Sequence, residues 1–296
     1  MKQEVEMFKT HLEISRILSK NGVVKPLSHI KENMSDKETM RKLFDAVTAR
    51  AEGARPPLQQ DGWRGVLRDL QMLQNLIPVV DMSGVMLSYT ESLLSSGSQT
   101  NIELAGSVME GLIDTGDSLQ LILTAWRHYY TSAASLNDPD IDLARKCLSL
   151  APDGVREVLD CYDLIASLQS LADFGLSDVL PVTVLNCKDR MDLVRRAVET
   201  RNNAYKNTQR LMKLASLLKV CGGESVEGVV WATIARRALQ VRVKMGFSGV
   251  ERLIQIIEKT SISCKPYLDW AIIFWRVICL DCCCIRAHLH QIINSL

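Results

Sequence analysis

The apolar residues of this chain recur at the spacing of an α-helix, in one short segment after another. The pattern is clearest in the second half, where Cys161, Leu164, Ile165 and Leu168 fall at i, i+3, i+4 and i+7. Such spacing places the four side chains on one face of a helix. A single helix of about 15 residues cannot hide that face from water, so each helix needs a partner across a short loop. The pattern therefore predicts antiparallel helix pairs.

Composition favours the same fold class. Only 5% of the 296 residues are aromatic, and Gly (16) and Pro (8) are few, which favours helix over strand. The formal net charge of +1 argues against a surface built as a whole for nucleic acid, because such proteins are usually strongly basic. The length suits either two ordinary domains or one elongated array.

Turn and cap signals divide the chain into successive helices. Asn21-Gly22 is suited to a C-terminal cap, Ser35 and Glu38 fit a capping box, and Asp138 with Pro139 fits the start of a helix. Residues 180–185 read as an extended connector. The expected helices span residues 5–20, 35–51, 63–77, 79–94, 101–114, 119–130, 138–150, 153–174, 189–200, 203–220 and 225–240.

These helices predict an all-α fold, an irregular α-solenoid of antiparallel helix pairs. Successive pairs share little sequence identity, so no short-period repeat of the tetratricopeptide or HEAT kind is expected. A bundle of similar helices is the alternative. About ten helices in up-down order stack more readily into a superhelix than around one axis.

An ordered series of segments resembles one known family. Residues 142–150, 159–181, 188–198 and 205–220 are similar to the helical secretory-pathway protein 39 domain of the neuroblastoma-amplified sequence family, and residues 8–34 and 91–109 resemble preceding parts of it. The resemblance covers residues 1–240, expected to form an α-solenoid segment of that domain. Residues 241–296 show no match and are expected to form a divergent helical tail. Members of the family are far longer and carry a β-propeller, so a fragment or an alternative product is expected.

The resemblance implies a function without chemistry. Members of the family are non-enzymatic scaffold subunits of a Dsl-type vesicle-tethering complex at the endoplasmic reticulum (ER), acting in Golgi-to-ER retrograde transport. The implied partners are the Rad-interacting and Zeste-white-ten-like tether subunits and ER SNARE proteins. A link to nonsense-mediated mRNA decay is secondary. No partner-contact motif can be matched position by position, so the partner-binding residues stay unknown. The alternative is an RNA-binding or other helical-repeat adaptor.

The tail contains an apolar stretch of about the length of a membrane span, Tyr267–Ile285. Asp269, Arg276 and Asp281 would each be costly at bilayer depth, which favours a buried or partner-facing helix. Palmitoylation of Cys282–Cys284 is an alternative anchor. The charged N-terminus lacks the apolar region of a secretory signal, so a cytoplasmic location is expected. The resemblance implies that the protein is peripheral at the ER membrane, through its partners.

Nine cysteines raise the question of metal binding. Cys279 and Cys282 form a CxxC followed by Cys283, Cys284, His288 and His290, but the spacing compresses these groups into one helix, which makes no closed tetrahedral zinc site. Cys147, Cys161, Cys187 and Cys221 lie in helical patterns and are expected to act as small buried hydrophobes in a reducing compartment.

Candidate chemical residues are few. Asp138, Asp140 and Asp142 alternate as in a calcium loop, but Leu143 replaces the required Gly, so helix capping is favoured. His128 is interpreted as a packed or solvated histidine. The basic residues Arg236, Arg237, Arg242 and Lys244 are interpreted as a solvated helix face. No nucleophile elbow, P-loop or dinucleotide fingerprint is present, so neither an enzyme nor a cofactor, catalytic or metal site is expected.

Overall fold

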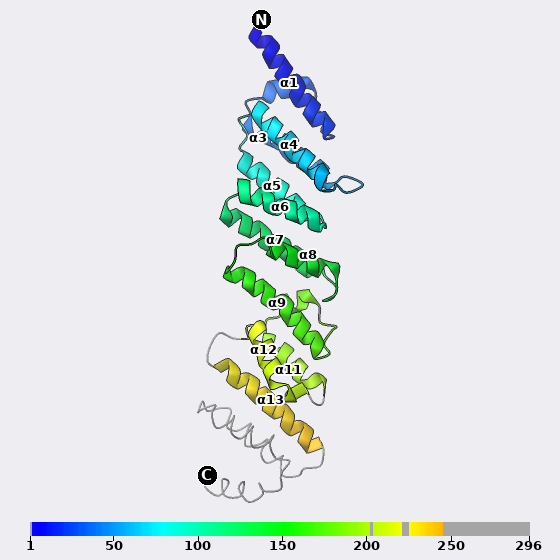
Figure 1. Cartoon of the computed structure of the whole chain (residues 1–296), viewed down its shortest axis with the longest axis vertical. Helices are drawn as coiled ribbons and strands as arrows, with labels where there is room; N and C mark the ends of the chain where they lie inside the picture. The colour runs from blue at the N-terminus through cyan, green and yellow to red at the C-terminus, as the bar shows by residue number, and fades with distance from the viewer. Residues whose placement is uncertain (1, 202–203, 221–224, 245–296) are drawn as a thin grey trace, which may run out of the picture. The chain divides into compact units, whose positions relative to one another are not determined.

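A computed structural model describes residues 2–201, 204–220 and 225–244 (Figure 1). Throughout these ranges the regular structure is helical and contains no strand, which confirms the all-α prediction. The chain divides into two compact units, residues 1–162 and 163–296. Each unit is described by itself.

The first unit is a stack of helix pairs in two layers. α3, α5 and α7 contact one another in succession to form one layer, and α4, α6 and α8 form the other, with α1 against α4. Each helix of the first layer also contacts the helix that follows it in the chain. This is the arrangement of an α-solenoid built from antiparallel pairs. The helices are α1 (Lys2–Lys20), α2 (Leu27–Asn33), α3 (Lys37–Glu52), α4 (Gln60–Leu76), α5 (Met82–Leu94), α6 (Gln99–Leu112), α7 (Thr115–Ser132) and α8 (Pro139–Leu148).

An aromatic pair joins the two layers. The rings of Trp63 on α4 and Tyr89 on α5 meet edge to face, with centroids 5.6 Å apart. The Tyr89 hydroxyl donates a hydrogen bond of 2.8 Å to the backbone carbonyl of Trp63. Both side chains are fully buried, so this bond satisfies the only polar atom that Tyr89 brings into the core.

The first helix is covered along only part of its length. Ile14, Ile17 and Leu18 in its C-terminal half are buried. In the N-terminal half, Val5, Met7, Phe8 and Leu12 are each about half exposed. The apolar face of α1 therefore extends beyond the helices that pack against it within the described residues.

The second unit begins within α9 (Arg156–Asp173), which crosses the boundary between the units. α11 lies at its centre and contacts α12, α13 and the short 3-10 helix η1. The Arg190 guanidinium donates a hydrogen bond of 2.9 Å to the carbonyl of Leu218, just beyond the end of α12. The remaining elements are α10 (Pro181–Asn186), α11 (Arg190–Thr200), η1 (Ala204–Lys206), α12 (Thr208–Leu217) and α13 (Ser225–Lys244).

The extended connector predicted at residues 180–185 is wrong. Pro181 to Asn186 form the helix α10, with Leu180 as its N-cap and Pro181 in the first turn. The β-branched Val182, Thr183 and Val184 favour strand, but proline at the first helical position already has a helical φ angle. Burial of Pro181 and Val184 then outweighs the local preference.

Three further details differ from the sequence prediction. The single helix predicted over residues 203–220 is η1 followed by α12. The cap of α3 is Asp36 and not Ser35, since its carboxylate accepts hydrogen bonds from the amides of Glu38 and Thr39. The short helix α2 follows Pro26, where only a turn was expected. The other predicted helices are present, with ends that differ by a few residues.

The Asp138 carboxylate caps α8, as predicted. It accepts hydrogen bonds from the amides of Asp140 (3.0 Å) and Ala134 (2.9 Å). The bond from Ala134, followed by that from Asp140, lowers the pKa of Asp138. Pro139 occupies the first turn, and the described residues contain no group of side chains able to hold a metal ion.

Three predictions fall outside the described residues. The division at residue 240 stays a prediction, because residues 245–296 are not described, and the same holds for the Tyr267–Ile285 stretch and the cysteines after Cys187. In the part of the chain that the structure does describe, no helix is long and apolar enough to cross a membrane.

The buried cysteines make a prediction about thiol chemistry. Burial raises the pKa of Cys147 to about 12 and that of Cys161 to about 11, from a usual value of 9.0. Cys187 is only half-buried. We expect iodoacetamide at pH 8 to label Cys187 in the folded protein but to spare Cys147 and Cys161 until urea is added, as measured by peptide mass spectrometry. Labelling of Cys147 at the rate of Cys187 without urea would contradict the buried assignment.

The same shifts set a dependence of stability on pH. Because folding raises both pKa values, the neutral thiols stabilise the fold fully below pH 9.0, and this contribution is lost as the pH rises toward about 11 and 12. Replacing both residues by Ser, whose hydroxyl does not ionise in this range, should remove that part of the loss of stability at alkaline pH. The free energy of unfolding from urea titrations at several pH values measures it.

Candidate partner-binding groove

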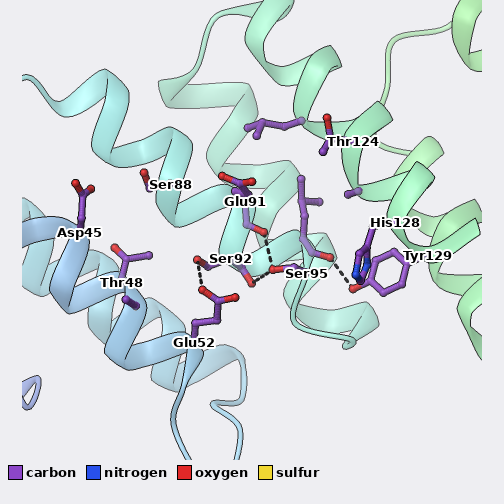
Figure 2. Close-up of a pocket in the computed structure, with 14 residues that line it drawn as sticks. Asp45, Thr48, Glu52, Ser88, Glu91, Ser92, Ser95, Thr124, His128 and Tyr129 are labelled. Carbon is purple, nitrogen blue, oxygen red and sulfur yellow. Dashed lines mark hydrogen bonds between the residues drawn. The ribbon is translucent and has the colours of Figure 1, made fainter. Parts of the chain in front are cut away.

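A hollow in the first unit lies along the first layer of helices. Its volume is about 450 Å³, and it is bounded by the C-terminal halves of α3, α5 and α7 (Figure 2). These three helices run in the same direction, since each is separated from the next by one antiparallel helix. The lining residues are Asp45, Thr48, Ala49, Glu52, Ser88, Glu91, Ser92, Leu94, Ser95, Leu121, Thr124, Ala125, His128 and Tyr129.

The groove combines an apolar floor with an acidic and hydroxyl-bearing rim. Leu94 and Tyr129 are buried beneath it, and Leu121 and Ala125 are half-buried. Neither lysine nor arginine is among the lining residues.

The three acids of the rim, which are Asp45, Glu52 and Glu91, differ in how far they are neutralised. Asp45 pairs with Arg41 at 2.9 Å, and the same guanidinium donates to the Ser88 hydroxyl at 3.4 Å. Glu52 accepts one hydrogen bond of 3.2 Å, from the Ser92 hydroxyl. The Glu91 carboxylate makes no ion pair with a described residue. Two carboxylates therefore face the groove without a cation.

Helix ends add to this negative charge. Glu52 is the last residue of α3, and Glu91 lies in the last turn of α5. The C-terminal end of a helix carries a partial negative charge, so an acid there is repelled and a cation is attracted. Side-chain charges and helix dipoles thus act in the same sense at the groove.

The Tyr129 hydroxyl fixes one wall of the groove. It donates to the carbonyl of Leu94 at 2.7 Å and accepts from the amide of Gly97 at 3.0 Å. Burial raises the pKa of Tyr129, so the phenol stays neutral in ordinary buffers. The turn between α5 and α6 is held against α7 by these two bonds, and the groove is formed before any ligand arrives.

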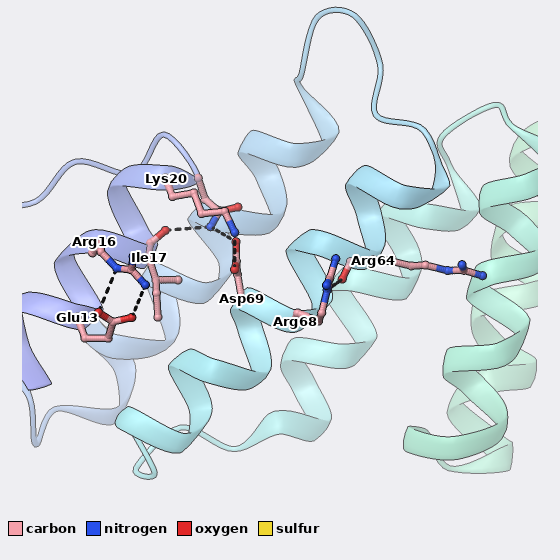
Figure 3. A network of polar contacts seen from close by, with 8 residues as sticks. Glu13, Arg16, Ile17, Lys20, Arg64, Arg68 and Asp69 are labelled. Atoms are coloured by element: carbon pink, nitrogen blue, oxygen red, sulfur yellow. Dashed lines mark hydrogen bonds and ion pairs between the residues drawn. The ribbon is translucent and has the colours of Figure 1, made fainter.

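A second, smaller hollow of about 290 Å³ lies beside the end of α1. Its buried acid, Asp69, accepts hydrogen bonds of 2.8 Å from both the Lys20 ammonium and the Asn21 amide (Figure 3). The Asn21 amide also donates to the carbonyl of Ile17 at 2.9 Å. Because the Asp69 carboxylate is satisfied from within the chain, its contacts attach α1 to α4, and a basic ligand would find no free acceptor on it.

The residues singled out in the sequence mostly serve structural roles. His128 lines the groove as an exposed side chain, edge-on to Tyr129 with ring centroids 5.5 Å apart, in accord with the solvated interpretation. Arg236 is exposed on α13, and Arg237 donates to the carbonyl of Glu199 at 3.2 Å. The side chains of Arg242 and Lys244 lie outside the described set.

Sequence reasoning missed Glu52 and Glu91. Each is an ordinary exposed acid at the end of an amphipathic helix, and helical periodicity shows which face is buried but not which exposed faces become neighbours. Both acids lie at the C-terminal end of a helix, where the helix dipole disfavours negative charge. This position is the one signal in the sequence that could have indicated them.

Comparison with known proteins shows relatives of one kind. The chain is 33% identical over 258 residues to the NBAS subunit of NRZ tethering complex of Homo sapiens, a match that covers 80% of this chain and 11% of the relative. It is 25% identical over 243 residues to the MAG2-interacting protein 2 of Arabidopsis thaliana, covering 80% of this chain and 10% of the relative. The chain thus spans about a tenth of the length of these relatives. No protein-family model matches it.

Tyr129 provides a test of the groove wall. Replacing Tyr129 by Phe leaves the carbonyl of Leu94 and the amide of Gly97 without their partner, so we expect a loss of about 1–3 kcal/mol in the free energy of unfolding. Urea denaturation followed by circular dichroism measures it. The control is Tyr162→Phe, an exposed tyrosine, and equal losses in the two variants would show that the hydroxyl of Tyr129 has no special role.

Asp69 provides a test of the attachment of α1. Asp69→Ala removes the acceptor shared by Lys20 and Asn21 and leaves one N–H of the part-buried Asn21 amide unpaired, at a cost of about 1–3 kcal/mol. In the control, Glu13→Gln, an exposed pair with Arg16 is lost, and the change should be much smaller. Denaturation midpoints that fall equally in both variants would rule out the anchoring role.

Proposed function

We propose that this chain, which is similar over 80% of its length to the NBAS subunit of NRZ tethering complex, acts as a non-enzymatic scaffold subunit of a vesicle-tethering complex. The observation that carries the proposal is the match to a named tethering-complex subunit at 33% identity. The stacked helix pairs of the first unit support it, since such stacks expose long surfaces for other proteins. The match covers about a tenth of the relative, so only the role of this segment is proposed.

The finer proposal concerns the place and the partners. We propose action in Golgi-to-ER retrograde transport, with Rad-interacting and Zeste-white-ten-like tether subunits and ER SNARE proteins as partners. Association with the ER membrane would then be peripheral and would pass through those partners. A role in nonsense-mediated mRNA decay is a secondary proposal that rests on family resemblance alone.

An RNA-binding helical-repeat adaptor is the competing function. The electrostatics of the groove count against it at that surface, because uncompensated Glu52 and Glu91 repel phosphates. An RNA-binding repeat protein also reads bases with a regular set of side chains in each repeat, and successive helix pairs here show no such regularity.

Co-purification tests the proposal. The full chain is mixed separately with each recombinant tether subunit and with the cytosolic part of each ER SNARE, and the mixtures are resolved by size-exclusion chromatography. We expect stoichiometric comigration with at least one tether subunit. Salt-sensitive binding of RNA, without comigration of any of these proteins, would favour the competing function instead.

A further inference from the structure

We propose that the groove between α3, α5 and α7 receives a lysine- or arginine-bearing segment of a partner protein. That the partner is a protein rests on the proposed function. The chemistry of the contact is new, because the comparisons say nothing about it.

The charge of the groove selects a cation. Glu52 and Glu91 project from neighbouring helices around one hollow (Figure 2), and neither is paired with a cation among the described residues. Some exposed acids of the first unit pair with a cation of the same helix, as in Glu6–Lys9 at 2.8 Å and Glu38–Lys42 at 2.9 Å. No described residue supplies such a cation to Glu52 or Glu91, so a cation from a partner can approach both.

The helix ends select for a cation independently of the carboxylates. The last turns of α3 and α5 line the groove, and the partial negative charges of these two helix ends add there. An anionic ligand, such as a phosphate backbone, would meet both the carboxylates and these dipoles.

The floor of the groove fits the rest of a basic side chain. Lysine and arginine pair a charged head with an aliphatic stem that is stabilised against apolar surface. Leu94, Leu121 and Ala125 provide such a surface beneath the acidic rim. Hydroxyls of Ser95 and Thr124 on the same rim can accept hydrogen bonds from a guanidinium or ammonium.

The smaller hollow shows what an internally satisfied site looks like. Its acid, Asp69, is buried, and both carboxylate oxygens accept donors from this chain. A basic partner would have to displace Lys20 there. The groove requires no such exchange, because Glu91 has no cation to lose.

The test compares two variants of the full chain. In the first, Glu52→Gln and Glu91→Gln remove both charges while keeping the shape of each side chain and an acceptor for the Ser92 hydroxyl. In the control, Glu32→Gln and Glu110→Gln remove two exposed acids of the same unit that lie outside the groove. The probe is a fluorescein-labelled helical peptide of Ala, Leu and Arg, beside an otherwise identical peptide with Gln in place of Arg, and binding is read by fluorescence anisotropy.

We expect the Arg peptide to bind the unaltered chain and the control equally, and to bind the groove variant about tenfold more weakly. The Gln peptide should bind all three weakly. The groove variant should also melt no lower than the unaltered chain, since it loses two acids that the helix ends repel. Equal affinity of the Arg peptide for all three proteins, no detectable binding, or displacement by single-stranded RNA overturns the proposal.

The co-purification separates this inference from the proposed function. If a tether subunit comigrates equally with the unaltered chain and the groove variant, the groove assignment is wrong and the proposed function stands. If the Arg peptide depends on Glu52 and Glu91 while no tether subunit or SNARE comigrates, the groove assignment stands and the proposed function is wrong.

Discussion

Helices of 13 to 19 residues, such as α5 and α1, carry an apolar stripe that none of them can bury alone. In the first unit this need is met by neighbours within the layer and across it, so α5 packs against α3 and α7 in its own layer and against α4 and α6 in the other. Stability therefore comes from contacts between successive pairs, in the manner of a one-dimensional array. Tyr89 and Tyr129, which apolar packing buries, each donate a hydrogen bond to a backbone carbonyl of a neighbouring helix. Because hydrogen bonds are directional and apolar contacts are not, these bonds fix the register between the helices.

The same constraint explains how far the sequence could predict the fold. Periodicity and caps identified most helices, because the amphipathic stripe and the Asp138-Pro139 signal act over a few residues. The prediction failed at Pro181–Asn186, where β-branched residues favour strand and burial of Val184 decides the outcome. It failed again between η1 and α12, since a break of one residue leaves the apolar spacing of the segment almost unchanged.

The groove could not be predicted in the same way. Asp45 and Glu52 lie on α3 and Glu91 lies on α5, and which exposed faces adjoin depends on how the pairs stack. Sequence does show that each acid avoids the buried stripe, and the i, i+4 spacing of Arg41 and Asp45 within α3 favours their ion pair. It does not show that Glu52 and Glu91 come to line the same hollow, because that depends on how α3 packs against α5. The absence of catalytic motifs was visible in the sequence, and the proposed function rests on similarity to a tethering-complex subunit over 80% of the chain.

The uneven covering of α1 gives one helix two dynamic regimes. Its C-terminal half is tied into the unit through buried Ile14, Ile17 and Leu18 and through the Lys20 and Asn21 contacts with Asp69. In its N-terminal half Val5, Phe8 and Leu12 are about half exposed, and the helix's own hydrogen bonds and the exposed Glu6–Lys9 pair are the described contacts that oppose fraying there. Amide hydrogens near Phe8 should therefore exchange with solvent deuterium through local opening of a turn or two, whereas those near Ile17 should exchange only when the helix separates from α4. Protection of the amide hydrogens from exchange would therefore rise from the N-terminal to the C-terminal end of a single continuous helix.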